Sequence, residues 1–395
     1  MPKLTICGGG NAAHVLIALG PNAGWEVDVF APLADETARL QAGAAAGGIT
    51  AVFGTRRVTG CPRRISSNPD EVIPGSELVL LALPAFAHGA TLQTIAPYLD
   101  TGAVVGALPA RSGFDYQVQA ILNRRPRLFG LQTLPWACRI TAYGQTVEVL
   151  GTKAVVDLAV SPAAETVSLI ETLAALLGIR LKPVTSFLTL TLANTGQLIH
   201  PGIMYGLCQS READTFAAVD IPLFYQGVDA PTAAVLQAMS DEVQAIAQAV
   251  ATHDASFDPA EVLGLFDWLR HSYPTDIADD GTLQRAFNTN RAYAGLRIPT
   301  RPAGPGTFAI DFLARYLAED VPYGLVVLRG IAELIGVSTP TIDCVITWAE
   351  TRLGRQYLLN GALAGADLPQ TRAPQAYGIL DLNKVAESQS NRVAR

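Results

Sequence analysis

The chain has 395 residues, 49% of them hydrophobic, and a formal net charge of −7 at pH 7. This length predicts two domains, because a single hydrophobic core seldom grows so large. The negative charge and the lack of a basic tract argue against nucleic acid and anionic membranes as partners, and no apolar run is long enough to cross a bilayer. Five cysteines lie far apart without the spacing of a metal site. We therefore expect free thiols, a cytoplasmic location and no metal.

The N-terminal residues predict a strand, a glycine turn and a helix in succession. Residues 4–7 are a short apolar run, three glycines follow at once, and residues 11–19 have a helical pattern. The pattern Gly8-x-Gly10-x-x-Ala13 suits a dinucleotide fold, in which glycines allow a tight turn and a close approach to a pyrophosphate. The alternative is an ordinary strand–helix turn that binds nothing. The candidate cofactor-binding residues of this stretch are Gly8, Gly9, Gly10, Asn11, Ala12 and Ala13.

A second strand is expected at residues 26–30, followed by a helix at 34–41. In NAD sites the end of this strand usually carries Asp or Glu for the ribose hydroxyls. Here it reads Phe30-Ala31-Pro32, which supplies neither that acid nor a basic residue for a 2′-phosphate. This stretch therefore gives only weak support for NAD(H) over NADP(H).

Strands and helices alternate up to residue 186. Residues 49–53 and 57–64 are expected as short strands around a turn, and the apolar runs 78–83 and 103–107 as central parallel strands. Pro84 and Ala85, in a loop expected at the carboxyl edge of the sheet beside the glycine turn, are further candidates for cofactor binding. Residues 145–150 and 154–160 suggest a hairpin around Gly151. A helix at 162–177 and a strand at 180–183 complete a doubly wound, Rossmann-type α/β domain over residues 1–186.

From residue 187 to 395 the pattern is helical, which predicts an all-helical second domain with a cleft between the two domains. His200 stands next to Pro201, at an expected break in an apolar helix. A histidine on an apolar helix is often a satisfied core residue, but a proline kink directed at a cleft would make it a candidate acid and base.

Asp320 and Arg315 each allow two interpretations. Asp320 precedes Val321-Pro322 and is either a helix N-cap or the carboxylate that orients His200. Arg315 is either a surface ion pair or a donor that reaches an anionic cofactor or substrate. The C-terminal half contains a single lysine, Lys384, so a lysine-based mechanism is disfavoured. The residues alone thus predict an NAD(P)-dependent oxidoreductase with a His–Asp pair.

The chain is similar to the opine dehydrogenases, in particular to the octopine dehydrogenase type, over nearly its whole length. The strings that carry this resemblance are Cys7-Gly8-Gly9-Gly10-Asn11, Pro84-Ala85-Phe86-Ala87-His88, Thr133-Leu134-Pro135-Trp136-Ala137-Cys138-Arg139, Val149-Leu150-Gly151-Thr152-Lys153, Pro222-Leu223-Phe224-Tyr225-Gln226-Gly227, Arg315-Tyr316-Leu317 and Asn360-Gly361-Ala362-Leu363. The resemblance implies NADH-dependent reductive condensation of an α-keto acid, usually pyruvate, with the amino group of an amino acid.

The resemblance also implies roles for individual residues. His200 would be the catalytic acid and base, Asp320 its orienting partner, and Arg315 a donor to the cofactor pyrophosphate that couples cofactor binding to domain closure. Thr133 and Cys138 would lie at the amino-acid pocket, together with His200. Members that use arginine are expected to hold its guanidinium with an acid at the position of Gln132. Because a neutral amide cannot offset that charge, we expect an amine donor other than arginine.

Two further functions are compatible with the residues. One is a His-dependent NAD(P) dehydrogenase of a 2- or 3-hydroxy acid, and the other is a non-catalytic NAD-binding sensor. If the protein is an enzyme of either kind, we expect small-molecule substrates as its partners. We expect the chain to act as a monomer or a small homo-oligomer.

Overall fold

The computed structural model describes residues 1–381, and the chain divides into two compact units. Unit 1 comprises residues 1–190, and unit 2 begins at Thr191. The expected boundary at residue 186 falls just before helix α7 (Phe187–Leu192), and the division by contacts falls within that helix.

Unit 1 contains an eight-stranded sheet whose strands lie in the order β12-β11-β8-β7-β6-β1-β2-β5. These strands are β1 (Lys3–Cys7), β2 (Glu26–Phe30), β5 (Arg64–Ser66), β6 (Leu78–Leu81), β7 (Val104–Ala107), β8 (Arg127–Leu131), β11 (Val155–Ser161) and β12 (Arg180–Pro183). From β5 to β8 all neighbours are parallel, whereas β11 runs antiparallel to β8. Six of the strands have the order 3-2-1-4-5-6 of a dinucleotide-binding fold, with its switch point between β1 and β6.

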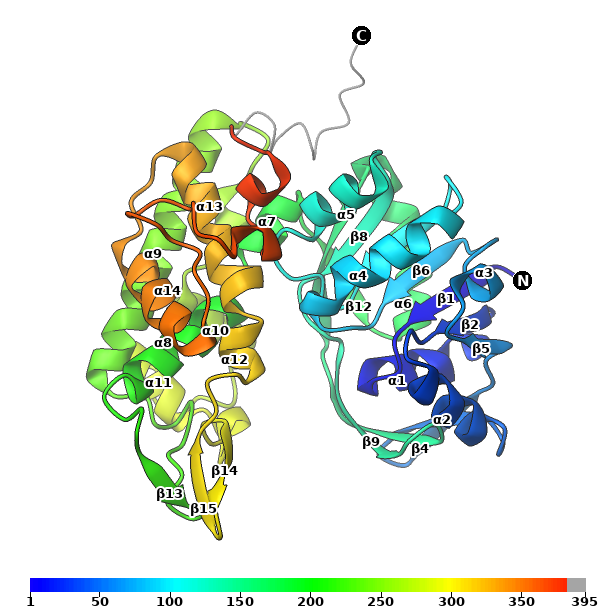
Figure 1. The fold of residues 1–395 in the computed structure, drawn as a ribbon, viewed down its shortest axis with the longest axis horizontal. Coiled ribbons are helices and arrows are strands. Elements are labelled where there is room, and N and C mark those ends of the chain that lie inside the picture. Colours follow the sequence, from blue (N-terminus) through cyan, green and yellow to red (C-terminus); the bar gives the residue numbers. More distant parts are fainter. Residues whose placement is uncertain (382–395) are drawn as a thin grey trace. The chain divides into compact units, whose positions relative to one another are not determined.

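The helices of unit 1 cover both faces of this sheet. They are α1 (Asn11–Leu19), α2 (Ala34–Ala44), α3 (Pro69–Val72), α4 (Ala85–Ile95), α5 (Phe114–Leu122) and α6 (Thr166–Leu177). Leu4 and Ile6 of β1 belong to the core cluster that includes α1 and α6, and Cys7 belongs to the cluster that includes α4 and α5. Figure 1 shows α4 and α5 over one face. Burial on both faces explains why these strands are continuous apolar runs.

A second, four-stranded sheet of order β4-β3-β10-β9 changes two expectations, and the start of α4 changes a third. It consists of β3 (Ile49–Phe53), β4 (Arg56–Gly60), β9 (Trp136–Ala142) and β10 (Thr146–Thr152). The single strand expected at 57–64 is two strands in different sheets, because Pro62 cannot donate to a ladder and interrupts the run. The hairpin is β9–β10, turning at Gly144 with φ +73°, and β11 joins the main sheet instead. The loop expected at 84–88 is the first turn of α4, with Pro84 as its N-cap.

Unit 2 is mainly helical, with one small sheet that the sequence did not predict. Its helices are α8 (Gly196–Cys208), α9 (Ala230–His253), α10 (Leu265–Ser272), α11 (Leu283–Thr289), α12 (Arg315–Ala318), a π-helical turn (Val321–Leu325), α13 (Val326–Ile335) and α14 (Pro340–Leu353). Strands β13 (Thr215–Ala217), β14 (Thr300–Gly304) and β15 (Thr307–Ile310) form an antiparallel sheet at one end of the unit (Figure 1). These strands are three to five residues long, and only one of their residues, Ile310, is buried. They therefore lack the apolar pattern that identifies a strand.

Candidate functional site

In unit 1 the glycine turn lies at the switch point of the sheet. Gly8 has φ +120°, and its N–H donates to the Phe30 carbonyl at 2.8 Å. A Cβ at Gly8 would lie 2.8 Å from Leu83 Cδ2 and 2.9 Å from the Ala82 carbonyl oxygen. Both the backbone conformation and the close approach of the β6 end therefore require glycine here.

Gly10 is glycine for a different reason. It is the N-cap of α1 with an ordinary φ of −82°, and a Cβ there would meet no atom within 4 Å. The structure thus leaves free space beside Gly10, at the start of α1. The N–H groups of Asn11, Ala12 and Ala13 belong to the first helical turn and have no intrahelical partners. Ala13 is fully buried. This arrangement fits a dinucleotide pyrophosphate.

Side chains of α1 form hydrogen bonds that connect the glycine turn to the β9–β10 hairpin. The Asn11 carboxamide oxygen accepts from the Ile140 N–H at 2.8 Å. His14 is fully buried; its Nδ1 donates to the Gly10 carbonyl at 3.0 Å, and its Nε2 accepts from the Gly144 N–H at 2.8 Å. Burial lowers the pKa of His14, and the Gly10 bond partly opposes this shift. His14 is therefore a neutral structural residue behind the turn.

The other unit 1 candidates lie at or after the ends of strands. Pro84 and Ala85 begin α4 at the carboxyl end of β6, beside β1. Gln132 and Thr133 follow β8, and the Thr133 hydroxyl accepts from Lys153 Nζ at 2.7 Å. Cys138 lies in β9, and burial raises the pKa of its thiol to about 11. Cys138 is therefore a neutral thiol at pH 7 and no nucleophile.

In unit 2 the structure brings His200 and Asp320 together across 120 residues of sequence. His200 Nδ1 lies 2.7 Å from Asp320 Oδ2, with 20% and 2% of the two side chains exposed. A carboxylate only accepts, so Nδ1 carries the proton and Nε2 is the reactive nitrogen. The Asp320 side chain makes no cap bond to the helix that follows. Helix α8 continues through Pro201, so the expected break at His200 is wrong; the chain breaks earlier, between α7 and α8.

Two tyrosines that the sequence did not single out complete the surroundings of His200. The Tyr225 hydroxyl lies 3.0 Å from His200 Nε2, and the Tyr316 ring stacks on the imidazole at 4.2 Å between centroids. Tyr225 and Tyr316 lie close enough that each contributes to the raised pKa or opposes it in the other. Burial raises the pKa of Tyr225, which keeps its phenol protonated. Their only signal in the sequence is a place inside the strings 222–227 and 315–317.

Arg315 and Glu319 form an ion pair one helical turn apart. Arg315 Nε donates to Glu319 Oε2 at 2.5 Å, while 60% of the Arg315 side chain stays exposed and Glu319 is buried. The ion-pair interpretation of Arg315 is thus observed, and the guanidinium keeps an accessible edge.

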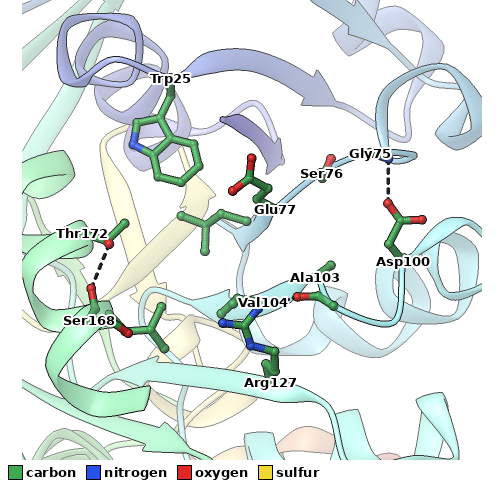
Figure 2. Close-up of a pocket in the computed structure, with 13 residues that line it drawn as sticks. Trp25, Gly75, Ser76, Glu77, Asp100, Ala103, Val104, Arg127, Ser168 and Thr172 are labelled. Atoms are coloured by element: carbon green, nitrogen blue, oxygen red, sulfur yellow. Dashed lines mark hydrogen bonds between the residues drawn. The ribbon is translucent and has the colours of Figure 1, made fainter. Parts of the chain in front are cut away.

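The cavity in Figure 2 lies away from the glycine turn. It has a volume of about 410 Å³. Glu77, Ala103 and Arg127 line it just before or at the start of β6, β7 and β8, so it opens at the amino edge of the parallel sheet. Ligands of such sheets bind at the carboxyl edge. Within residues 1–381 no cluster of three or more His, Cys, Asp or Glu could hold a metal, and no helix there has the length and apolarity of a membrane span.

A switch-point glycine turn and a hydrogen-bonded His–Asp pair are typical of dinucleotide-dependent dehydrogenases, and comparisons with known proteins agree. The family described as NAD/NADP octopine/nopaline dehydrogenase, alpha-helical domain, matches residues 183–353. The octopine dehydrogenase of Mizuhopecten yessoensis is 38% identical, over 97% of this chain and 98% of its own. The tauropine dehydrogenase of Arabella iricolor is 34% identical, over 98% and 100%.

A solved structure of octopine dehydrogenase with NADH and L-arginine matches with a TM-score of 0.92 at 35% identity and covers all of both chains. The chain therefore belongs to the octopine/nopaline dehydrogenase family. It is an opine dehydrogenase, an oxidoreductase that acts on CH–NH bonds, which confirms the prediction from the resemblance.

Proposed function

We propose that this enzyme uses NADH to condense an α-keto acid, in the first place pyruvate, with the amino group of an amino acid. The His200–Asp320 hydrogen bond of 2.7 Å is the observation that carries this proposal. Related structures described as octopine dehydrogenase with NADH and pyruvate, and with NADH and L-arginine, support the choice of reactants.

The amine adds to the keto group to give a carbinolamine, which must lose hydroxide as water before reduction. We propose that His200 Nε2 donates the proton to this leaving hydroxyl, and that Asp320 holds the Nδ1 proton and stabilises the imidazolium. NADH supplies the hydride that reduces the resulting imine to a secondary amine. In the reverse direction neutral His200 would accept the proton.

Tyr225 extends the proposed proton path. When His200 is neutral, the Tyr225 O–H donates to Nε2; when His200 is protonated, Nε2–H donates to the Tyr225 oxygen. A hydrogen bond that reverses in this way can return a proton to His200 after each turnover.

For cofactor binding we propose the glycine turn, residues 8–13, with Pro84 and Ala85 beside it and Arg315 as a donor to the pyrophosphate. The open space at Gly10 supports the first part, and the exposed guanidinium supports the last. Arginine suits this role because it stays charged and can bind phosphate oxygens bidentately.

For the amine donor we propose an amino acid with a small or uncharged side chain, bound near Gln132, Thr133 and Cys138. Gln132 and the neutral Cys138 thiol offer no negative charge to a guanidinium. An amino-acid panel with pyruvate and NADH tests this: alanine, glycine, taurine or β-alanine should exceed arginine in kcat/KM, and a strong preference for arginine would refute it.

His200→Ala tests the function itself. We expect NADH binding within about twofold of the wild type and a loss of turnover of about 10²- to 10⁴-fold, the usual contribution of general acid–base catalysis. Turnover of pyruvate by the wild type without an amine would instead indicate a hydroxy acid dehydrogenase. NADH binding without turnover on any amine and keto acid would indicate a sensor.

We further propose a cytoplasmic enzyme that acts as a monomer or small homo-oligomer. The five cysteines are all free thiols, which supports a reducing compartment. Sedimentation at micromolar concentration measures the oligomeric state.

A further inference from the structure

The end of β2 lies at the glycine turn but carries no acid for a ribose. The Gly8 N–H donates to the carbonyl of Phe30, the last residue of β2, at 2.8 Å. Ala31 and Pro32 follow. The adenosine ribose of a dinucleotide binds at this place in such folds, and its two hydroxyls require an acceptor. The acceptor must therefore come from another element.

Glu36, in the first turn of α2, brings a carboxylate to this position. A Cβ built on Gly9 would lie 2.7 Å from Glu36 Oε1 and 2.8 Å from its Cδ. The carboxylate thus packs directly on the glycine turn, and any side chain at Gly9 would force it away. The Thr37 hydroxyl donates to the Ala31 carbonyl at 2.8 Å, which fixes the start of α2 against the end of β2.

Tyr143 of the β9–β10 turn holds Glu36 in place. Its hydroxyl donates to Glu36 Oε1 at 3.1 Å, and its ring contacts His14 edge to face at 5.2 Å. Burial raises the pKa of Tyr143, with Glu36 adding to the shift, so the phenol remains a donor. The Arg39 guanidinium lies 4.3 Å from the Tyr143 ring centroid and 3.7 Å from Asp35 Oδ2. The Glu36 carboxylate is therefore held on the glycine turn by a hydrogen bond from the β9–β10 turn.

We propose that Glu36 is the ribose-binding residue of this enzyme and selects NADH over NADPH. Its carboxylate accepts from the ribose hydroxyls, and a 2′-phosphate in the same place would meet its negative charge at close range. The inference rests on the proposed use of a nicotinamide dinucleotide and deepens it. It assigns the acid that is missing at the end of β2 to the next helix along the chain.

The test is a direct measurement of binding on the full chain. Dissociation constants of NADH and NADPH are determined without substrates, from nicotinamide fluorescence, for the wild type, Glu36→Gln and Asp35→Asn. Asp35→Asn is the matched control, since it makes the same charge change one residue earlier on a side chain that is 87% exposed.

We expect Glu36→Gln to weaken NADH binding by about 10- to 100-fold, the usual worth of a charged hydrogen bond. NADPH binding should be unchanged or tighter, so that the preference for NADH shrinks. Asp35→Asn should leave the ratio within about twofold of the wild type, because an exposed charge is screened. The two proposals fail in different ways: a wild type that binds neither cofactor refutes the proposed function, and NADH binding that is the same in Glu36→Gln refutes the role of Glu36.

Two other results would also overturn the assignment. One is an equal change of the ratio in Asp35→Asn, which would make the effect one of general charge. The other is tight NADPH binding by the wild type that Arg39→Gln abolishes, which would make Arg39 the residue that reads the 2′ position. Gln is nearly isosteric with Glu, and equal melting temperatures of the variants confirm that each has folded.

Discussion

His200 has two ring nitrogens with different partners, and each partner comes from a distant part of the sequence. Asp320 binds Nδ1 and Tyr225 binds Nε2, at 2.7 and 3.0 Å. The first contact determines which nitrogen is reactive. The second occupies that nitrogen until a substrate oxygen replaces the phenol or shares it.

Tyr225→Phe removes the hydroxyl and keeps the ring, which stacks on Tyr293 at 4.0 Å. Because the phenol is the hydrogen-bond partner of the proposed catalytic nitrogen, its loss should lower kcat by about 2- to 10-fold, the equivalent of one ordinary hydrogen bond. NADH binding should stay within about twofold of the wild type. Tyr293→Phe is the control, and a kcat that stays unchanged in Tyr225→Phe would contradict the proposed path.

At the scale of elements, α1 depends on the β9–β10 turn. His14 bonds to the Gly10 carbonyl on one side and to the Gly144 N–H on the other. Gly43 of α2 and Gly144 also lie in contact, since a Cβ on Gly43 would be 2.7 Å from the Gly144 Cα. The cofactor turn is therefore held from behind by a hairpin of the second sheet.

His14→Phe should lower the free energy of unfolding by about 1–3 kcal/mol, because it leaves the buried Gly144 N–H without its acceptor. The pH dependence follows from the lowered pKa. The unfolded chain takes up a proton at His14 first, so wild-type stability falls as the pH drops below about 6.5. The variant should lack the part of the pH dependence of the unfolding free energy that comes from His14. Urea unfolding at pH 7.5 and 5.5 measures it, with the exposed His271→Asn as control; equal slopes in wild type and His14→Phe would contradict it.

At the scale of the whole molecule, most of the proposed cofactor site lies in one unit, and the proposed proton-transfer groups lie in the other. The glycine turn and Glu36 belong to unit 1, and the His–Asp pair with its tyrosines belongs to unit 2. Cofactor binding and proton transfer should therefore be separable by mutation.

NADH at about 100 times its Kd should raise the free energy of unfolding by about 2.7 kcal/mol. NADH should also slow amide hydrogen exchange at residues 8–14, to the same extent in the wild type and in His200→Ala. Gly10→Ser should abolish the protection, because its side chain would occupy the space that we propose for the pyrophosphate. It should not lower the stability, because serine is a favoured N-cap and its Cβ meets no atom. Gly102→Ser, at another open glycine, should behave as wild type. Normal protection in Gly10→Ser would mean that the pyrophosphate does not bind at this turn.

The sequence by itself determined the elements whose signal is local. The run at β1, the glycines, helix α1 and the apolar strands β6 and β7 follow from residue patterns a few positions long. The resemblance in strings such as 133–139 and 222–227 was enough to identify an opine dehydrogenase, since those strings keep their order along the chain.

Only the tertiary structure decided which distant residues meet. The β9–β10 pairing, the small sheet of unit 2 and the contacts of Tyr225 with His200 depend on chain segments far apart, and short exposed strands carry no periodic signal. The same holds for Glu36: the usual position for a ribose acid is the end of β2, so the sequence suggested that the acid was missing. Its place on Gly9 arises from how α2 packs against the turn, which no local pattern encodes.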